Sequence, residues 1–367
     1  MNIRVLHVIA RMNKGGTSSY LYNLLSNSPE NLEHLLVTGT VSTHETEDLR
    51  LKMLPNIKVP WLKREINIFD DLRARKQIKN IISDFKPDVI NTHTFKAGFL
   101  TRTLSTSIPL IHTFHGHLLD DPEFVGFKSE IIKIIERFLS RRSVMLTTTG
   151  ENVRLDLERA GVHHELWRNI YPGLDPLSFV SPENAKAELG LTNIKPERPL
   201  IAWHSRFAPV KNVQLVMEVA EALPDYLFML SGGGPLYDKY SSAHPKNVII
   251  LGWQAPENVF GAADILISTS FNEGLSFSII EASMLGKPCI ATNVGAAAEI
   301  IEDGVTGFLV DHSVASFVEK INLLVFNTQL RMTMGQQARE LATRRFGMRV
   351  FVQKYVDLIQ EAIQKRN

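Results

Sequence analysis

Two glutamates, Glu273 and Glu281, stand eight positions apart in a segment expected to run from a loop into a helix. Carboxylates accept hydrogen bonds, so two of them in one place suit the vicinal hydroxyl groups of a sugar ring and of a ribose. The segment also permits a purely structural explanation, because Ser278 and Glu281 have the S-x-x-E spacing of a helix capping box. The residues alone leave both interpretations open.

Glycines stand at two places where the backbone is expected to approach a ligand. Gly274 follows Glu273, and the next three amides are expected to be free donors at the start of a helix: those of Leu275, Ser276 and Phe277. Gly15 and Gly16 separate the first expected strand from the first expected helix, a position that favours an anion. The dinucleotide fingerprint G-x-G-x-x-G and the P-loop sequence are both absent, so an ordinary glycine-rich turn explains Gly15 and Gly16 equally well.

Two cations, Arg206 and Lys211, follow an expected strand in the sequence His-Ser-Arg-Phe-Ala-Pro-Val-Lys-Asn. A planar guanidinium and a compact ammonium at the carboxyl end of a strand suit a diphosphate. The alternative is a solvated charged loop, which is the usual explanation for two cations five residues apart.

Four histidines lie in or just after two neighbouring expected strands: His93, His112, His115 and His117. Imidazoles are common metal ligands. However, strand alternation points His112 and His115 to opposite faces, and no acidic ligand stands at a diagnostic spacing, so we predict no metal site. We expect His115 at the mouth of a cleft, near the reacting atoms. His112 is better explained as a hydrogen-bonded histidine beside the sheet, and that explanation is also open for His93.

The elements that position these residues alternate between short apolar runs and longer amphipathic segments. This rhythm predicts parallel sheets covered on both faces by helices. It breaks at residues 172–198, which are rich in proline and glycine, and then resumes. We therefore predict an α/β protein of two doubly wound domains, 1–172 and 173–345, facing an interdomain cleft, with helices from residue 313 onward. The expected strands are 3–9, 34–38, 88–92, 109–114, 144–148, 199–204, 226–231, 248–251, 264–268 and 288–291.

Composition excludes several classes of protein. The chain has 367 residues with 40 Lys and Arg against 39 Asp and Glu, so it lacks the basic excess of a nucleic-acid binder. Its one cysteine, Cys289, can form neither an internal disulfide nor a cysteine-based zinc site. We read no signal peptide at the N-terminus and no apolar run long enough to span a bilayer, so we expect a cytoplasmic protein.

The segment from Glu273 to Val310 resembles the retaining GT-B glycosyltransferases of family 4. The resemblance rests on Glu-x7-Glu and on the glycine-rich sequence of residues 286–310. It extends to Arg206 and Lys211 and to the segments 15–17, 87–94, 113–116, 232–236, 251–253 and 262–270, so that it covers nearly the whole chain.

The resemblance implies a GT-B fold of two Rossmann-like domains. The first domain binds the acceptor, and the final helix, 346–367, crosses back to it, whereas the second domain binds a nucleotide-sugar donor. Arg206 and Lys211 would hold the diphosphate, Glu281 the ribose hydroxyls, and Glu273 the hydroxyls of the transferred sugar. His115 would lie beside that sugar and the acceptor hydroxyl. The donor-binding segments also contain Gly15, Gly16, Gly233, Trp253, Gly274, Leu275, Ser276 and Phe277.

The activity implied is retaining transfer of a sugar from a nucleoside diphosphate, with UDP as the expected carrier, to a glycan or lipid-linked glycan in surface polysaccharide biosynthesis. No cofactor or metal is expected, because Asp120-Asp121-Pro122 is a poor match to Asp-x-Asp. Ser205, Ser276 and Ala296 depart from the family pattern around the sugar pocket and leave the sugar undetermined. Glucosylation of a small metabolite, a nucleotide-sugar epimerase and a non-enzymatic sugar-binding protein are the alternatives.

Basic residues alternate with apolar ones over 61–82 and 128–142 in the first half. A basic amphipathic face suits peripheral contact with anionic lipid at the inner face of a membrane. The solvated faces of two ordinary helices explain the same pattern equally well.

Overall fold

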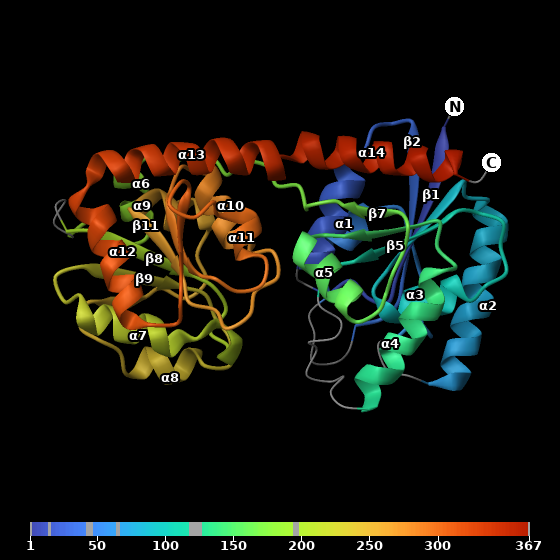
Figure 1. Ribbon diagram of the computed structural model, residues 1–367, viewed down its shortest axis with the longest axis horizontal. Coiled ribbons are helices and arrows are strands. Elements are labelled where there is room, and N and C mark those ends of the chain that lie inside the picture. Colours follow the sequence, from blue (N-terminus) through green and yellow to red (C-terminus); the bar gives the residue numbers. More distant parts are fainter. Residues whose placement is uncertain are drawn as a thin grey trace. The chain divides into compact units, whose positions relative to one another are not determined.

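The computed structural model describes residues 2–13, 16–41, 47–63, 67–116, 127–193 and 198–365. The side chains of residues 127 and 128 are not described, and Gly15, Arg64, His117, Asp120 and Asp121 also lie outside the described residues. The chain divides into two compact units. The first comprises Met1–Gly173 together with Met348–Asn367, and the second comprises Leu174–Gly347 (Figure 1).

The first unit is built on a seven-stranded sheet in the order β3-β2-β1-β4-β5-β6-β7, in which neighbouring strands are parallel. The order reverses between β1 and β4, which creates a switch point at the carboxyl ends of these strands. The strands are β1 (Ile3–Ile9), β2 (Leu32–Thr38), β3 (Asn56–Lys58), β4 (Val89–His93), β5 (Leu110–Phe114), β6 (Met145–Thr148) and β7 (Trp167–Asn169).

Helices cover both faces of this sheet (Figure 1). On one face, α1 and α14 pack on β1 through Leu21, Tyr355 and their neighbours, and on the other, α2 and α3 pack on it through Ile78 and Leu100. The helices of this unit are α1 (Gly16–Asn27), α2 (Ile68–Phe85), α3 (Phe95–Arg102), α4 (Phe127–Ser140), α5 (Glu151–Arg159) and α14 (Met348–Gln364), with a 3-10 turn at Leu49–Met53.

The second unit is built on a six-stranded parallel sheet in the order β10-β9-β8-β11-β12-β13, with its switch point between β8 and β11. The strands are β8 (Leu200–His204), β9 (Leu227–Ser231), β10 (Val248–Ile250), β11 (Ile265–Ser268), β12 (Cys289–Thr292) and β13 (Gly307–Val310). The fully buried side chains of Trp203, Phe228 and Phe317 belong to its largest hydrophobic cluster, which joins the sheet to α7 and α12. The α/β fold predicted from the sequence is confirmed.

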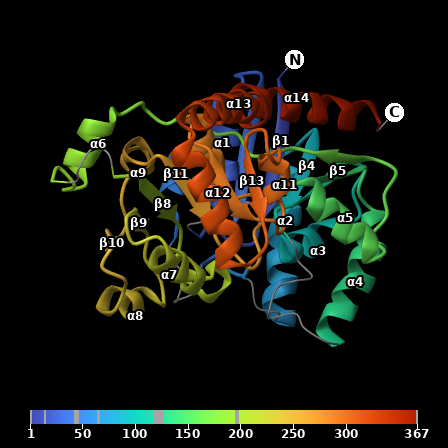
Figure 2. The ribbon, with the colours of Figure 1, turned by 60° about the vertical axis from the view of Figure 1, so that its left-hand side comes forward.

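The remaining elements of the second unit surround this sheet, as Figure 2 shows from a second side. They are α6 (Pro182–Glu188), the 3-10 helix η4 (Pro209–Lys211), α7 (Val213–Ala222), α8 (Tyr237–Ser242), α9 (Pro256–Ala262), α10 (Phe277–Met284), α11 (Ala297–Ile300), α12 (Val314–Phe326) and α13 (Thr328–Phe346). The final helical stretch is interrupted at Gly347, so α13 and α14 are separate helices that belong to different units. The sequence analysis did not predict β3, β7 or β13, which have three or four residues each.

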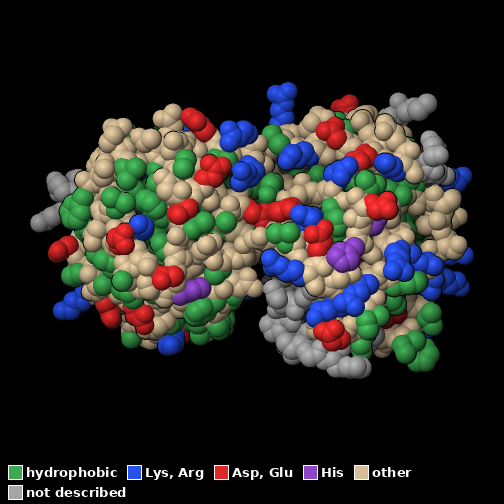
Figure 3. Space-filling view, in the orientation of Figure 1, with side chains coloured by type: hydrophobic (Ala, Val, Ile, Leu, Met, Phe, Trp, Pro, Cys, Tyr) green, Lys and Arg blue, Asp and Glu red, His purple; other side chains and the backbone are tan. Residues whose placement is uncertain are grey.

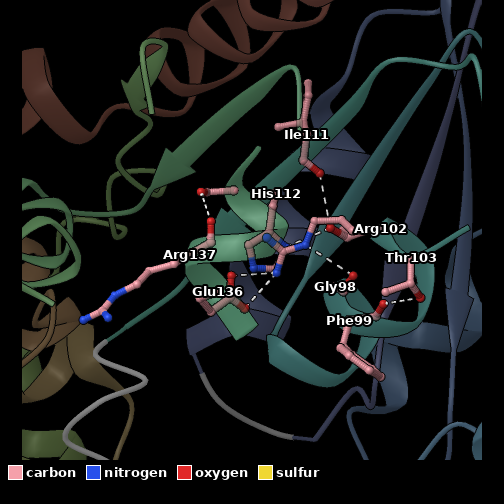
Figure 4. A network of polar contacts seen from close by, with 10 residues as sticks. Gly98, Phe99, Arg102, Thr103, Ile111, His112, Glu136 and Arg137 are labelled. Atoms are coloured by element: carbon pink, nitrogen blue, oxygen red, sulfur yellow. Dashed lines mark hydrogen bonds and ion pairs between the residues drawn. The ribbon is translucent and has the colours of Figure 1, made fainter. Parts of the chain in front are cut away.

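A buried ion pair links two helices of the first unit (Figure 4). Arg102 of α3 donates two hydrogen bonds from one nitrogen to the carboxylate of Glu136 of α4, at 2.7 and 2.8 Å, and both side chains are fully buried. Burial raises the pKa of Glu136, whereas the Arg102 guanidinium opposes that rise. The contact fixes α4 against α3, since breaking a buried pair would leave an uncompensated charge inside the protein.

Among the described residues, none of the helices combines the length and the apolar character needed to cross a bilayer.

Candidate functional site

The second unit gathers its predicted site residues at the carboxyl edge of its sheet. Arg206 and Lys211 follow β8, and Glu273 follows β11, which is the strand next to β8 across the switch point. Because parallel strands end at the same edge, the two loops meet there.

A direct contact joins these two loops. The Lys211 ammonium donates a 2.5 Å hydrogen bond to Oε2 of Glu273, and both side chains are mostly buried, with 18% and 11% of their surfaces exposed. Partial burial strengthens such a pair relative to a surface ion pair. Lys211 therefore neutralises Glu273 and holds one of its carboxylate oxygens, which leaves the other oxygen without a partner among the described residues.

Partly buried hydrogen bonds hold the backbone of Lys211 in place. The hydroxyl of Thr269, just after β11, donates toward the carbonyls of Lys211 and Asn212 at 2.9 and 3.1 Å, and it lies 3.2 Å from the indole nitrogen of Trp203. The amide of Phe271 adds a 2.8 Å bond to the carbonyl of Val210. The segment that follows β11 therefore holds the backbone of Lys211 and also leads to Glu273, the carboxylate that pairs with it.

The backbone of Glu273 is held from behind by the loop after β12. The amide of Ala296 donates to the Glu273 carbonyl at 3.1 Å. Gly295 has a φ of +53°, and a Cβ placed on it would lie 1.7 Å from that same carbonyl oxygen. Only glycine fits this close approach, so Gly295 is a positioning residue for Glu273 that the sequence patterns did not single out.

Glu273 is followed by a helix start whose amides face no acceptor. The helix α10 begins at Phe277 with Ser276 as its N-cap, and the Ser276 side chain makes no capping hydrogen bond. Within the described chain, no hydrogen bond is donated by the amides of Leu275, Ser276 or Phe277. Free donors at a helix start favour an anion or an electron-rich oxygen.

The capping-box alternative for Glu281 is wrong. Ser278 is the second residue of α10 rather than its N-cap, so Glu281 lies one turn into the helix and cannot reach back to cap it. Burial, with a smaller contribution from the nearby carboxylate of Glu257, raises the pKa of Glu281 to about 7. Raised carboxyl pKa values of this kind cluster at functional sites.

The remaining predicted residues of this unit lie on neighbouring loops. Arg206 is exposed, and none of the described carboxylates pairs with it. Gly233 accepts a 2.8 Å hydrogen bond from the amide of Phe207 through its carbonyl, and a Cβ on Gly233 would lie 2.6 Å from the indole nitrogen of Trp253. Trp253 itself is 63% exposed. The structure thus joins Lys211 to Glu273 and Gly233 to Trp253, while Glu281 interacts electrostatically with Glu257.

In the first unit, Gly16 and His115 follow β1 and β5 at the carboxyl edge of the sheet. Gly16 is the first residue of α1 and is exposed. His115 is half-buried, and its Nε2 lies 2.9 Å from Nδ1 of His93. Burial lowers the pKa of His115 to about 3, so its imidazole is neutral at physiological pH.

His93 and His112 lie on opposite faces of the sheet. His93 pairs in register with Thr113, and Thr92 with His112, which also confirms that His112 and His115 point to opposite sides. Both ring nitrogens of His93 have histidine partners, His115 at 2.9 Å and His7 at 3.1 Å. His112 is only half satisfied: Nδ1 lies 2.8 Å from the Thr92 hydroxyl, but Nε2 has no partner among the described residues.

His7 and His34 were missed by the sequence analysis. His7 Nε2 lies 3.1 Å from His34 Nδ1, so four imidazoles form one continuous row with His93 and His115. His7 and His34 are each the only histidine in an apolar strand, and that pattern is typical of an isolated histidine in a protein core. In the described part of the chain, no group of three or more histidine, cysteine or acidic side chains is arranged to hold a metal ion.

Comparison with known proteins identifies both halves of the chain. Residues 14–176 match the model of Glycosyltransferase Family 4, and residues 187–341 match the model of Glycosyl transferases group 1. The chain is 25% identical over 324 residues to the UDP-Gal:alpha-D-GlcNAc-diphosphoundecaprenol alpha-1,3-galactosyltransferase of Escherichia coli, a match that covers 82% of each protein. It is 29% identical over 319 residues to the D-inositol 3-phosphate glycosyltransferase of Corynebacterium glutamicum, covering 76% of this chain and 73% of that one.

The fold is shared with solved structures. The crystal structure of Anabaena HepE in complex with UDP superposes with a TM-score of 0.82 at 20% identity, covering 98% of this chain and 100% of HepE. This likeness shows the fold, and the two family models, which match the two halves of the chain, together with the relatives show a glycosyltransferase of the family 4 type.

Proposed function

We propose that this glycosyltransferase is a retaining enzyme that moves a sugar from UDP to a hydroxyl of a lipid-linked glycan during surface polysaccharide assembly. The observation that carries the proposal is the Lys211–Glu273 contact at the switch point of the second unit, beside helix-start amides that donate to no acceptor in the described chain. It offers cations for a diphosphate and an oriented carboxylate for sugar hydroxyls.

In this proposal, the departing diphosphate is stabilised by Arg206 and Lys211. When the bond between the anomeric carbon and the phosphate oxygen breaks, negative charge grows on that oxygen and positive charge on the sugar ring. Cations held in place before the reaction stabilise the growing charge without reorganisation. Arg206 is available because it pairs with none of the described carboxylates, and the support of Lys211 by Thr269 keeps its ammonium in one place.

Two carboxylates would bind the sugars of the donor. Glu273 keeps one carboxylate oxygen for hydroxyls of the transferred sugar, because Lys211 occupies the other. Glu281 would bind the ribose hydroxyls. The raised pKa of Glu281 is typical of a buried carboxylate without hydrogen-bond donors around it. The hydroxyl groups of a ribose diol would supply those donors.

The acceptor hydroxyl would attack the anomeric carbon from the side of the leaving group, which retains the configuration at that carbon. The new bond joins the acceptor oxygen to the sugar, the bond to the diphosphate breaks, and a phosphate oxygen of UDP takes the acceptor proton. His115 would lie beside the sugar and the attacking hydroxyl. We propose that the reaction needs no metal ion, since the two cations supply the positive charge.

Two observations support a lipid-linked acceptor: the name of a relative, and an exposed surface of the first unit. The E. coli relative is named for a diphosphoundecaprenol substrate. In the first unit, α2 and α4 expose large apolar side chains beside cations, as Figure 3 shows. The exposed apolar residues are Ile68, Phe69, Leu72, Ile131, Ile134 and Phe138. Arg142 lies over the Phe138 ring, whereas Lys63 and Arg73 are partly neutralised by Asp70. We propose that this surface contacts anionic lipid at the cytoplasmic side of a membrane.

Replacing Lys211 tests the core of the proposal. We expect Lys211→Ala to lower kcat for transfer from UDP-glucose by about 10²–10³-fold, because a charge-stabilising donor is lost while the fold remains. The exposed Lys246→Ala is the matched control and should leave the rate unchanged. Wild-type turnover in Lys211→Ala would reject the assignment, and the wild-type rate should persist in excess chelator.

The pKa of Glu281 predicts a pH-dependent affinity. Ribose hydroxyls bind best to the ionised carboxylate, so below pH 7 binding must first remove a proton. Affinity for UDP-glucose should therefore fall as the pH drops from 8 to 6, by at most about tenfold per unit. Calorimetric titration should show a flat profile for Glu281→Gln, and an equal pH dependence in both proteins would contradict the role of Glu281.

Gly295 offers a test of how Glu273 is positioned. Gly295→Ala would drive a methyl group into the Glu273 carbonyl. We therefore expect the transfer rate of the folded variant to fall, beyond any decrease that comes from a smaller folded fraction. Gly304→Ala is the matched control, because Gly304 also has a positive φ, +73°, but its Cβ would meet nothing within 4 Å. Both substitutions carry the same backbone strain, so equal transfer rates in the two variants would contradict the positioning role.

Membrane contact is tested by co-sedimentation with vesicles that contain anionic lipid. We expect Ile134→Glu with Phe138→Glu to abolish binding at low salt, because it removes exposed apolar area and adds negative charge. Phe326→Glu, which alters an 81% exposed phenylalanine of the second unit, should bind as the wild type does. A wild-type protein that stays in the supernatant at low salt would remove the membrane proposal.

A further inference from the structure

We propose that His34, His7 and His93 are positioning residues that set the tautomer of His115, so that His115 presents its Nδ1–H as a hydrogen-bond donor to the bound sugar or acceptor. The part that concerns the substrate rests on the proposed function, whereas the tautomer itself does not.

The register of the first sheet places the four histidines in a diagonal row. His34 on β2 pairs with Val5 of β1, two residues before His7. His7 pairs with Asn91 of β4, two residues before His93, and His93 pairs with Thr113 of β5, two residues before His115. A step of two residues keeps a side chain on the same face of a sheet, so all four imidazoles share one face and advance toward the carboxyl edge.

Each contact in the row joins an Nδ1 atom to an Nε2 atom. The pairs are His34 Nδ1 with His7 Nε2 at 3.1 Å, His7 Nδ1 with His93 Nε2 at 3.1 Å, and His93 Nδ1 with His115 Nε2 at 2.9 Å. A neutral imidazole carries one N–H and one lone pair, so His7 and His93 must each donate once and accept once. The four rings therefore share one tautomer, either all Nδ1–H or all Nε2–H.

The buried end of the row selects between these two states. Nε2 of His34 is buried and has no hydrogen-bond partner among the described residues. In the all-Nε2–H state it would be an orphaned buried donor, which folded proteins tolerate less readily than an under-satisfied acceptor. The all-Nδ1–H state avoids that donor, and His115 then accepts from His93 and keeps its own N–H at Nδ1.

The surroundings keep the row neutral. Among the described residues, the ionisable side chains in contact with the row are Tyr355 of α14, stacked on His7, and Tyr20 of α1, edge-on to His115, while His112, on the opposite face of the sheet, interacts electrostatically with His93. None of these three is a carboxylate that would stabilise an imidazolium. Burial lowers the pKa of all four histidines in the row, to about 4 for His34 and about 3 for His115.

The consequence is that His115 acts as a neutral donor rather than as a base. An imidazole whose second nitrogen already accepts from His93 can offer only its remaining N–H. Such a group suits a sugar or acceptor oxygen, and it agrees with a reaction in which the departing phosphate takes the proton.

The direct test reads the tautomer of His115 from two-bond ¹H–¹⁵N correlations in the full-length protein labelled at histidine, at pH 8. The His115 signals are assigned with a His115→Asn variant. We expect Nδ1–H in the wild type. His34→Asp replaces the buried end of the row with a carboxylate that can only accept, so His7, His93 and His115 should all change to Nε2–H. His34→Asn, the matched control, still has a donor and should keep the wild-type tautomer.

Enzyme activity then tests the part of the proposal that concerns the substrate. In His34→Asp, kcat should fall about tenfold, the value of one hydrogen bond, while affinity for UDP-glucose stays within about twofold of the wild type. His34→Asn should restore kcat.

An Nε2–H tautomer on His115 in the wild type, or an unchanged tautomer in His34→Asp, would overturn the inference. If His34→Asp does not fold, the wild-type spectrum alone still decides the tautomer. A protein that has the expected tautomers but transfers no sugar would refute the proposed function and leave the row of histidines intact.

Discussion

The hydrogen-bonded ion pair between Lys211 and Glu273 is the contact on which the candidate site of the second unit depends. It joins two loops that leave adjacent strands, and each loop has its own support: Thr269 holds the backbone of Lys211, and Ala296 holds that of Glu273. A cation and a carboxylate kept together in a partly buried place are oriented before any ligand arrives. Preorganisation of this kind is the main way in which enzymes stabilise charge that develops during a reaction.

Much of this arrangement could be predicted from the sequence, because it follows from the rule that parallel strands place their following loops at one edge. The α/β architecture and the placement of Arg206, Lys211, Glu273 and His115 after strands came from that rule together with the alternation of apolar and amphipathic segments. The competing role of Glu281 in a capping box could be rejected only with the structure, which starts α10 at Phe277 rather than at the residue after Ser278.

What the sequence did not reveal depends on contacts between distant segments. The approach of Gly295 to Glu273 is a backbone contact across 22 positions, and its only sequence signal is a glycine in a glycine-rich loop. The pairing of Arg102 with Glu136 looks in the sequence like two ordinary charges on two helices, although both are fully buried. The row of histidines can be recognised only when the register of four strands is known, and strand register cannot be predicted from single apolar runs.

That row also constrains how the first sheet assembles. A slip of β1 by one residue against β2 would turn every side chain of β1 to the other face, so His7 would lose both His34 and His93 and would face the apolar packing around Ile78 and Leu100. An apolar strand of valines and leucines could tolerate such an error, since both of its faces are buried. A strand with an imidazole in its middle cannot tolerate the error, because the shift breaks the hydrogen bonds between histidines. The histidines therefore disfavour misregistered sheets during folding.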